Sequence, residues 1–218
     1  MNNSKYLYVI SAVFVTSLIV SNIIAVKTGN FFGATLPVAV ILFPVSYIIG
    51  DVLTEVYGYE VARKIILLGF ACNALAVIAI LLGQALPGAS FWDAQEAYER
   101  ILGFTPRLLM ASFSAYLIGE LSNAKIMAFV RELTAGRWLW MRTISSTLIG
   151  QGLDSLVFLS VAFWGTLPPA VLLTLIFNQW LFKVTYEVIA TPLTYVVVNF
   201  LKRTESKTTE SPLLAASD

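Results

Sequence analysis

Charged and amide side chains interrupt several long apolar stretches of this sequence. These residues are the first candidates for chemistry, because a charge in the middle of a bilayer costs at least ~2.5 to 3.5 kcal/mol on insertion scales. The group comprises Asp51, Glu55, Glu120, Asn123, Lys125, Gln151, Asp154, Lys183 and Glu187. Such residues are poorly tolerated against acyl chains, so the pattern predicts that they face a bundle interior or a water-filled cavity.

The spacing of these residues predicts shared helix faces. Three pairs are separated by three or four positions, namely Asp51 with Glu55, Gln151 with Asp154, and Lys183 with Glu187. One interpretation is internal ion pairing without a ligand, in which Lys183 pairs with Glu187, and Lys125 pairs with Glu120 or Asp154. Glu55 lies near an expected cytoplasmic helix end, where it would be solvated.

The acids in this group outnumber the lysines by five to two. The excess must be protonated, hydrated or neutralised by a donor-rich or cationic solute. A guanine-like base suits this environment, because its ring N–H and amino groups can donate together to one carboxylate while amides serve its acceptor edge. Four aromatic residues are candidates to stack on such a ring: Phe43, Tyr47, Phe182 and Tyr186.

Composition indicates an integral membrane protein. The 218 residues are 58% hydrophobic and 12% charged, with a mean hydropathy of +0.79 and a net charge of +1. The near-neutral charge excludes a nucleic-acid binder. The single cysteine, Cys72, excludes an intramolecular disulfide, and the absence of histidine excludes the common zinc and haem ligand sets, so we expect no metal and no cofactor. An enzyme is disfavoured because Asp51 with Glu55 is the only nearby acid pair.

Six apolar stretches predict an all-α bundle of six transmembrane helices, over residues 6–26, 36–56, 65–86, 106–130, 143–165 and 170–201. With both termini cytoplasmic, nine Lys and Arg residues lie inside and three outside. We therefore expect one domain over residues 1–205 and a disordered tail over 206–218. The loop 87–105 predicts a short interfacial helix, acting as a lid, a surface anchor or a plain connector. Pro192 predicts a kink in the last helix.

Five segments together resemble the queuosine precursor transporter family. They are SNIIAVK (21–27), FPVSYIIGDVLTEVYGYEVARKII (43–66), GELSNAKIMAFVR (119–131), STLIGQGLDSLVF (146–158) and KVTYEVIATPLTY (183–195). The resemblance implies a bacterial inner-membrane protein that imports 7-cyano- and 7-aminomethyl-7-deazaguanine for queuosine synthesis in tRNA. It carries a substrate-binding role to Asn22, Asp51, Glu120, Asn123, Gln151, Asp154, Lys183 and Glu187, beside Tyr47 as a candidate aromatic contact. Queuine, queuosine or another small polar solute stay open as alternative substrates.

The family is also similar to the substrate-binding subunits of energy-coupling-factor transporters. These work with a separate ATPase module, and this chain has no GxxxxGK[ST] motif of its own. The resemblance therefore leaves three arrangements open: a facilitator, an ion-coupled carrier, or a binding subunit whose ATPase is another chain. It also leaves open a homodimer in the membrane.

Overall fold

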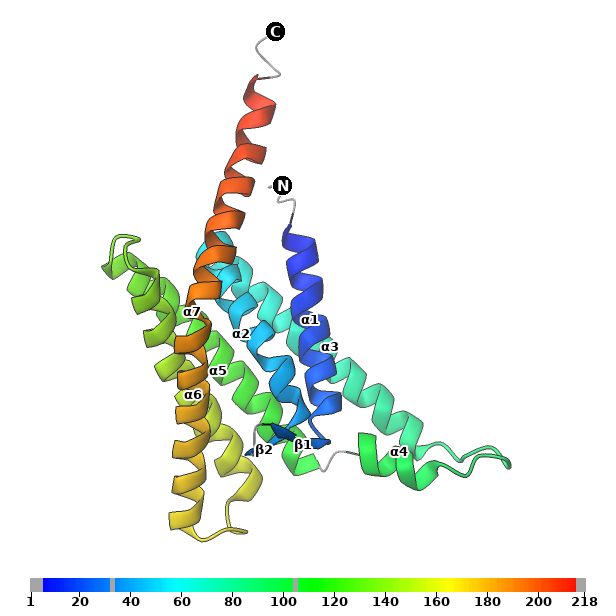
Figure 1. Ribbon diagram of the computed structural model, residues 1–218. Helices are drawn as coiled ribbons and strands as arrows, with labels where there is room; N and C mark the ends of the chain where they lie inside the picture. The colour runs from blue at the N-terminus through cyan, green and yellow to red at the C-terminus, as the bar shows by residue number, and fades with distance from the viewer. Residues whose placement is uncertain (1–5, 32–33, 104–105, 215–218) are drawn as a thin grey trace.

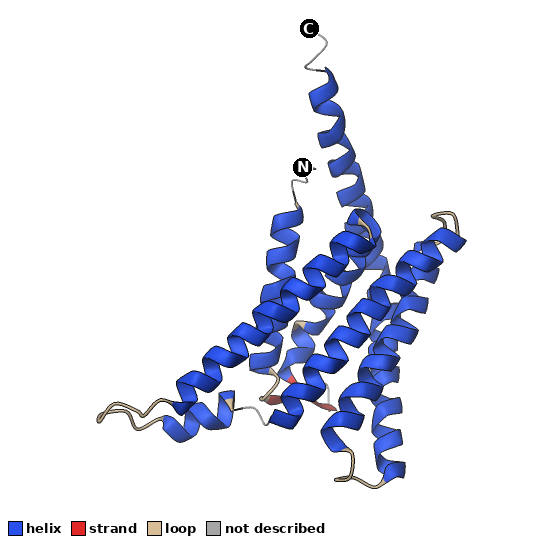
Figure 2. Ribbon diagram, turned by 180° about the vertical axis from the view of Figure 1, so that it is seen from behind, coloured by secondary structure: helices blue, strands red, loops and turns tan. Residues whose placement is uncertain are grey.

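The computed structural model describes residues 6–31, 34–103 and 106–214 and is built almost entirely of helices (Figures 1 and 2). The α-helices are α1 (Leu7–Ile24), α2 (Phe43–Val52), α3 (Tyr59–Ala85), α4 (Gln95–Leu102), α5 (Pro106–Leu133), α6 (Leu139–Phe163) and α7 (Pro169–Leu214). A 3₁₀ helix, η1 (Val38–Ile41), precedes α2, and a π-helix, η2 (Leu53–Tyr57), extends it. The expectation of an all-α chain is confirmed.

The long helices alternate in direction along the chain (Figure 1). Both termini, the junction of η2 with α3 and the turn between α5 and α6 lie at one end, which we call the terminal end. The turn between α6 and α7 and helix α4 lie at the opposite end. Four helices are long and apolar enough to cross a membrane, namely α1, α3, α6 and residues 169–204 of α7. The chain is therefore an integral membrane protein, while the expected count of six crossings stays a prediction.

The second expected span, 36–56, differs from the structure at its start. A hairpin of β1 (Thr28–Phe31) and β2 (Ala34–Pro37) pairs Thr28 with Pro37 and Phe31 with Ala34, and it includes the first two residues of this stretch. The α-helix begins only at Phe43, with a proline in its first turn, where the missing N–H leaves no bond unmade. The α-helix ends at Val52 and η2 continues it to Tyr57; Gly58 follows, with a φ of +85° that is readily adopted only by glycine.

Helix α7 continues on both sides of Pro192, and the kink expected there stays a prediction. Thr191 lies next to the proline, and its Oγ1 donates to the Glu187 carbonyl at 2.8 Å. The helix protrudes beyond the rest of the bundle (Figure 1) and continues to Leu214. It thus includes residues 206–214 of the expected disordered tail; residues 215–218 lie outside the described residues, and the domain boundary stays a prediction.

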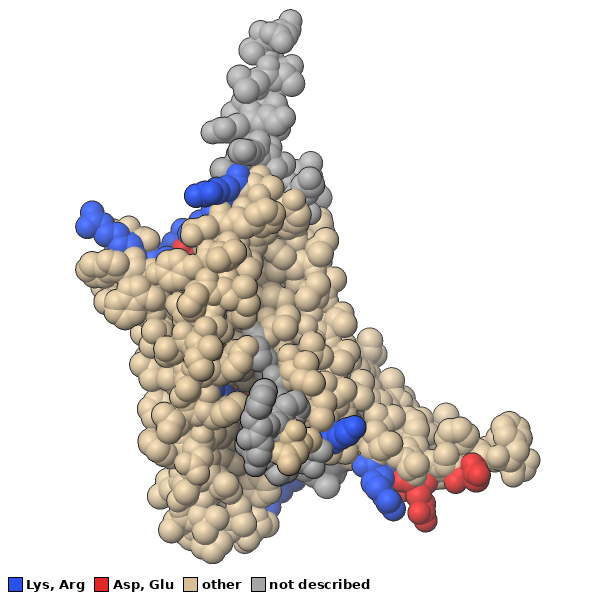
Figure 3. Space-filling view, viewed as in Figure 1, with Lys and Arg blue, Asp and Glu red and all other residues tan. Residues whose placement is uncertain are grey.

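The outer surface is apolar between two charged ends. Large hydrophobic side chains are exposed on most helices, for example Leu82 at 63% and Ile189 at 72%. In Figure 3, Lys and Arg gather at the terminal end, and charges of both signs gather over α4, with a largely uncharged band between them. Soluble proteins rarely expose so much contiguous apolar surface, whereas a membrane protein presents it to lipid.

Candidate functional site

The close packing of α5 on α6 positions the polar residues of the site. Gly119 and Gly150 face each other, and a Cβ added at Gly150 would lie 2.7 Å from Asn123 Cβ and 3.0 Å from the Gly119 carbonyl oxygen. A Cβ at Gly119 would lie 2.7 Å from Asp154 Cβ. Small residues let two membrane helices approach to this distance. The glycine pair therefore lets Asn123 pack beside Gly150 and Asp154 beside Gly119, about one helical turn apart along the contact.

Asp51 of α2 lies beside Asn123. Asn123 Nδ2 donates to Asp51 Oδ1 at 2.9 Å, and both side chains are buried. The Glu187 carboxyl from α7, also buried, is within side-chain hydrogen-bonding reach of Asp51. Glu120 is buried nearby, with its Oε2 atom 3.3 Å from the position that a Cβ on Gly50 would take. Carboxyl groups from three helices, α2, α5 and α7, therefore lie close together.

Lys183 supplies the positive charge of the site and forms an ion pair with Asp154 across α6 and α7. Tyr47 of α2 lies beside the same lysine. The alternative pairing of Lys183 with Glu187 is therefore wrong, although those two residues are four apart on one helix. Lys125, whose predicted partners were Glu120 or Asp154, is exposed and makes no ion pair within the described residues.

Several buried oxygens of the site lack a hydrogen-bond donor. Among the described residues, no donor reaches Asp51 Oδ2, Asn123 Oδ1, Gln151 Oε1 or Glu187 Oε1. The contact between Asp51 and Glu187 does not satisfy these oxygens while both groups are ionised, because a carboxylate has no hydrogen to donate. Leaving buried acceptors unpaired costs about 1 to 3 kcal/mol each. The arrangement therefore favours a ligand, or protons, that bring donors into this region.

We call Tyr47, Asp51, Glu120, Asn123, Asp154, Lys183 and Glu187 the polar cluster, because each contacts or interacts electrostatically with another member. Gln151 follows Gly150 on α6 and is also buried. Asn22 lies elsewhere, since its Nδ2 donates to Asn73 Oδ1 at 3.0 Å between α1 and α3. Among the described residues, no group of three or more acidic, cysteine or histidine side chains is arranged to hold a metal ion.

Two of the remaining aromatic candidates lie mainly against other surroundings, although Tyr186 also interacts electrostatically with Glu187. Phe182 is 47% exposed on the outer surface of α7, and Tyr186 packs against an apolar core cluster. The side chain of Phe43 lies outside the described residues. Tyr47 interacts with three members of the cluster, Lys183, Asp154 and Glu120.

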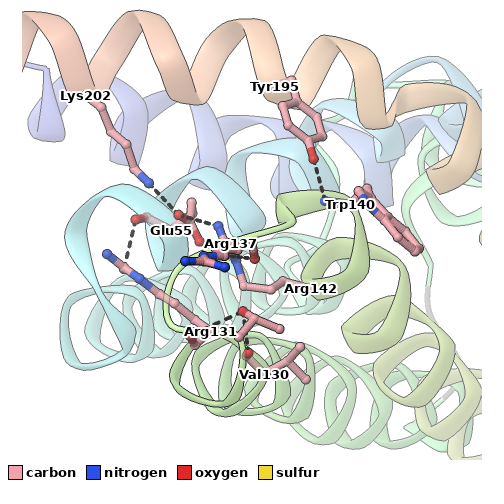
Figure 4. A network of polar contacts seen from close by, with 9 residues as sticks. Glu55, Val130, Arg131, Arg137, Trp140, Arg142, Tyr195 and Lys202 are labelled. Carbon is pink, nitrogen blue, oxygen red and sulfur yellow. Dashed lines mark hydrogen bonds and ion pairs between the residues drawn. The ribbon is translucent and has the colours of Figure 1, made fainter.

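A second polar group, missed by the sequence analysis, surrounds Glu55 at the terminal end (Figure 4). Glu55 is 1% exposed, so it lies inside the bundle as expected for the whole group of charged residues, and the alternative that it would be solvated is wrong. Its Oε1 atom accepts from Arg142 Nη2 at 2.8 Å and from Lys202 Nζ at 2.5 Å. Arg142, which lies between two of the expected spans, is 2% exposed. Residues 143–147, which follow Arg142, are rich in hydroxyl side chains. This run is the feature of the sequence that could have indicated a buried polar face here.

Shallow grooves lie away from both polar groups. They are formed by the end of α3, the loop 86–92 and α4, and they are lined mainly by apolar and aromatic side chains such as Trp92 and Tyr98. Phe91 is 88% exposed beside them. The predicted short helix in this loop is present as α4, while its role as a lid, anchor or connector stays a prediction.

The sequence is similar to known transporters over most of its length. The profile of the family described as "Putative vitamin uptake transporter" matches residues 37–197. A "Probable queuosine precursor transporter" of Bacillus subtilis (strain 168) is 30% identical over 187 residues, which cover 85% of this chain and 81% of that protein. The "Queuosine precursor transporter" of Escherichia coli (strain K12) is 27% identical over 180 residues, covering 80% and 78%. No solved structure shows a significant match.

Proposed function

The chain belongs to the "Putative vitamin uptake transporter" family, and on that premise we propose that it imports queuosine precursors across the bacterial inner membrane. The resemblance expected from the five sequence segments is thereby confirmed. The relatives are named as transporters, which agrees with the prediction that the chain is not an enzyme. The proposed substrates are 7-cyano- and 7-aminomethyl-7-deazaguanine, destined for tRNA modification.

The observation that carries this proposal is the set of buried acceptors without donors in and beside the polar cluster. Asp51 Oδ2, Glu187 Oε1 and the two amide oxygens of Asn123 and Gln151 are buried acceptors without a donor among the described residues. A guanine-like base carries an N–H and an amino group side by side, which is the complement of a carboxylate. Tyr47 lies close enough to the cluster to contact the flat ring, and aromatic side chains commonly stack on bases.

The charge of the cluster favours a cationic substrate. Four carboxyl groups, those of Asp51, Glu120, Asp154 and Glu187, accompany one lysine. Burying this excess of negative charge is costly unless protons or a cation neutralise it. The aminomethyl-bearing base carries a primary amine that is protonated at neutral pH, whereas the cyano-bearing base is neutral. We therefore expect the aminomethyl form to bind more tightly.

The proposed topology has six crossings, with α2 and α5 in addition to the four apolar helices. Helix α5 has 28 residues, long enough to span a bilayer, and its polar residues Glu120 and Asn123 point inward. The alternating helix directions and the shared end of both termini support an even number of crossings (Figure 1). The excess of Lys and Arg at the terminal end supports a cytoplasmic location for it.

Uptake of radiolabelled base into liposomes that contain only this purified chain tests the proposal. We expect saturable uptake of both deazaguanine bases, with the aminomethyl form competing more strongly, and no uptake by empty liposomes. A proton gradient imposed in a parallel sample separates a facilitator from a proton-coupled carrier. Binding without uptake would assign transport to a complex with a separate ATPase module or another partner. The absence of binding to folded protein would refute the proposed substrates.

A further inference from the structure

Glu55 ties four segments together at the terminal end of the bundle (Figure 4). Its carboxylate on η2 accepts from Arg142 of α6 and from Lys202 of α7. Its backbone carbonyl accepts from Arg131 Nη1 of α5 at 3.1 Å. We call these four residues the Glu55 cluster. Arg142 also donates to the Arg137 carbonyl at 2.7 Å, which fixes the turn between α5 and α6 to the same group.

The Glu55 cluster lies between the polar cluster and the terminal end. Glu55 follows Asp51 by four residues, Arg131 follows Asn123 by eight, and Lys202 follows Glu187 by fifteen. At 1.5 Å per helical residue these separations are about 6, 12 and 22 Å, all toward the same end. Any path from the polar cluster to the terminal end along α2, α5 and α7 therefore passes the Glu55 cluster.

An apolar layer separates the two polar groups. Val52, Met127, Val198 and Leu201 belong to one buried core cluster, and each is at most 5% exposed. Met127 lies midway between Asn123 and Arg131 on α5, and Val52 immediately follows Asp51 on α2. These packed side chains hinder a polar solute, while buried hydroxyls of Thr143, Thr147 and Thr194 lie in the same interval on α6 and α7. The ion pairs beyond this layer hold its helices together.

We propose that the Glu55 cluster and this apolar layer form the cytoplasmic gate of the transporter, and that substrate release requires Glu55 to separate from Arg142 and Lys202. This inference rests on the proposed function for its direction and substrate. Two features suit a contact that opens. Glu55 Oε2 and Arg142 Nε are buried without a hydrogen-bond partner among the described residues, so the closed arrangement is incompletely satisfied. Glu55 also lies in a π-helical turn, a geometry frequent at functional sites.

A cysteine placed just inside the gate tests the proposal. Ser146 is fully buried on α6, one turn deeper than Arg142, and its Oγ donates to the Thr143 carbonyl at 2.9 Å. The Ser146→Cys substitution is made in a Cys72→Ser background, which removes the native thiol. Labelling by a membrane-impermeant maleimide is followed in inside-out vesicles, whose outer surface is the cytoplasmic face. The test variant is Lys202→Gln, and the matched control is Lys64→Gln, which removes an exposed lysine of α3 at the same end.

We expect Lys202→Gln to speed labelling roughly two- to fivefold, since its ion pair is partly exposed, and Lys64→Gln to leave the rate unchanged. Glu55→Gln should speed labelling about tenfold or more, because its pairs are buried. Equal rates in all variants would overturn the gate. If the cysteine variant does not fold, hydrogen exchange of the backbone amides of residues 139–147 gives the same comparison. Labelling needs no substrate, so a failed uptake experiment would refute the proposed function without deciding the gate.

Discussion

Asp51→Asn tests the assignment of the polar cluster as the substrate site most directly. Asp51 uses Oδ1 to accept from Asn123, while no donor among the described residues reaches Oδ2. The asparagine keeps an oxygen for Asn123 and replaces only the second oxygen by an amide nitrogen. A substrate N–H that donates to Oδ2 would then lose a charge-assisted hydrogen bond, worth about 1.5 to 3 kcal/mol.

This loss corresponds to a roughly 10- to 150-fold rise in the Kd for the deazaguanine base. Folding should be little affected, because the new amide can donate to Glu187, whose Oε1 has no donor among the described residues. The Kd is measured by titration calorimetry on purified protein in detergent, together with the melting temperature. Asp93→Asn, at an exposed position in the loop before α4, is the matched control. An unchanged Kd in an Asp51→Asn protein that melts normally would remove Asp51 from the site.

Two further predictions concern the helix contact and the ion pair that hold the polar cluster. Gly150→Ala should lower stability by about 1 to 3 kcal/mol, because its Cβ would meet Asn123 Cβ at 2.7 Å, while Gly152→Ala, with its first contact at 3.4 Å, should change the melting temperature little. Asp154→Asn should destabilise the protein by about 3 kcal/mol by leaving Lys183 unpaired, and adding Lys183→Gln should restore part of that loss in denaturant titrations. Additive losses in the double variant, or equal effects of the two alanines, would contradict these assignments.

The helices that carry the polar cluster could be predicted from the sequence, because a buried charge in an apolar stretch has few tolerated positions. Asp51, Glu120, Asp154 and Lys183 were expected inside the bundle, and all of them lie at the polar cluster. Their exact partners could not be predicted. Lys183 and Glu187 share a helix face, yet the lysine pairs with Asp154, because the approach of α6 offers a carboxylate closer than the next turn of its own helix. The sequence spacing therefore identifies the possible ion-pair partners of a buried charge, and the tertiary packing determines which of them it contacts.

The Glu55 cluster escaped prediction for a related reason. Glu55 and Arg142 both lie near the ends of apolar stretches, where a charge is ordinarily solvated. Two contacts accompany their burial. Lys202 of α7 forms an ion pair with Glu55, and Arg142 donates to the carbonyl of Arg137 in the turn between α5 and α6. The ion pairs of Glu55 with Lys202 and Arg142 join residues 147 and 87 positions apart in the sequence. The hairpin at residues 28–37 was hidden in the same way, since its second strand begins what otherwise reads as a continuous apolar span.

The polar cluster and the Glu55 cluster share the helices on which they are built, and this sharing has a thermodynamic consequence. A helical segment is stiff over one turn, so a movement of η2 that separates Glu55 from Arg142 also displaces Asp51, four residues away. A substrate bound at Asp51 will therefore favour one state of the gate if its contacts differ between the open and closed states. A substitution that shifts the gate toward its open state then changes the apparent substrate affinity, by at most the ratio of the affinities of the open and closed states. The ion pairs around Glu55 would then affect both the substrate affinity of the polar cluster and the frequency with which the gate opens.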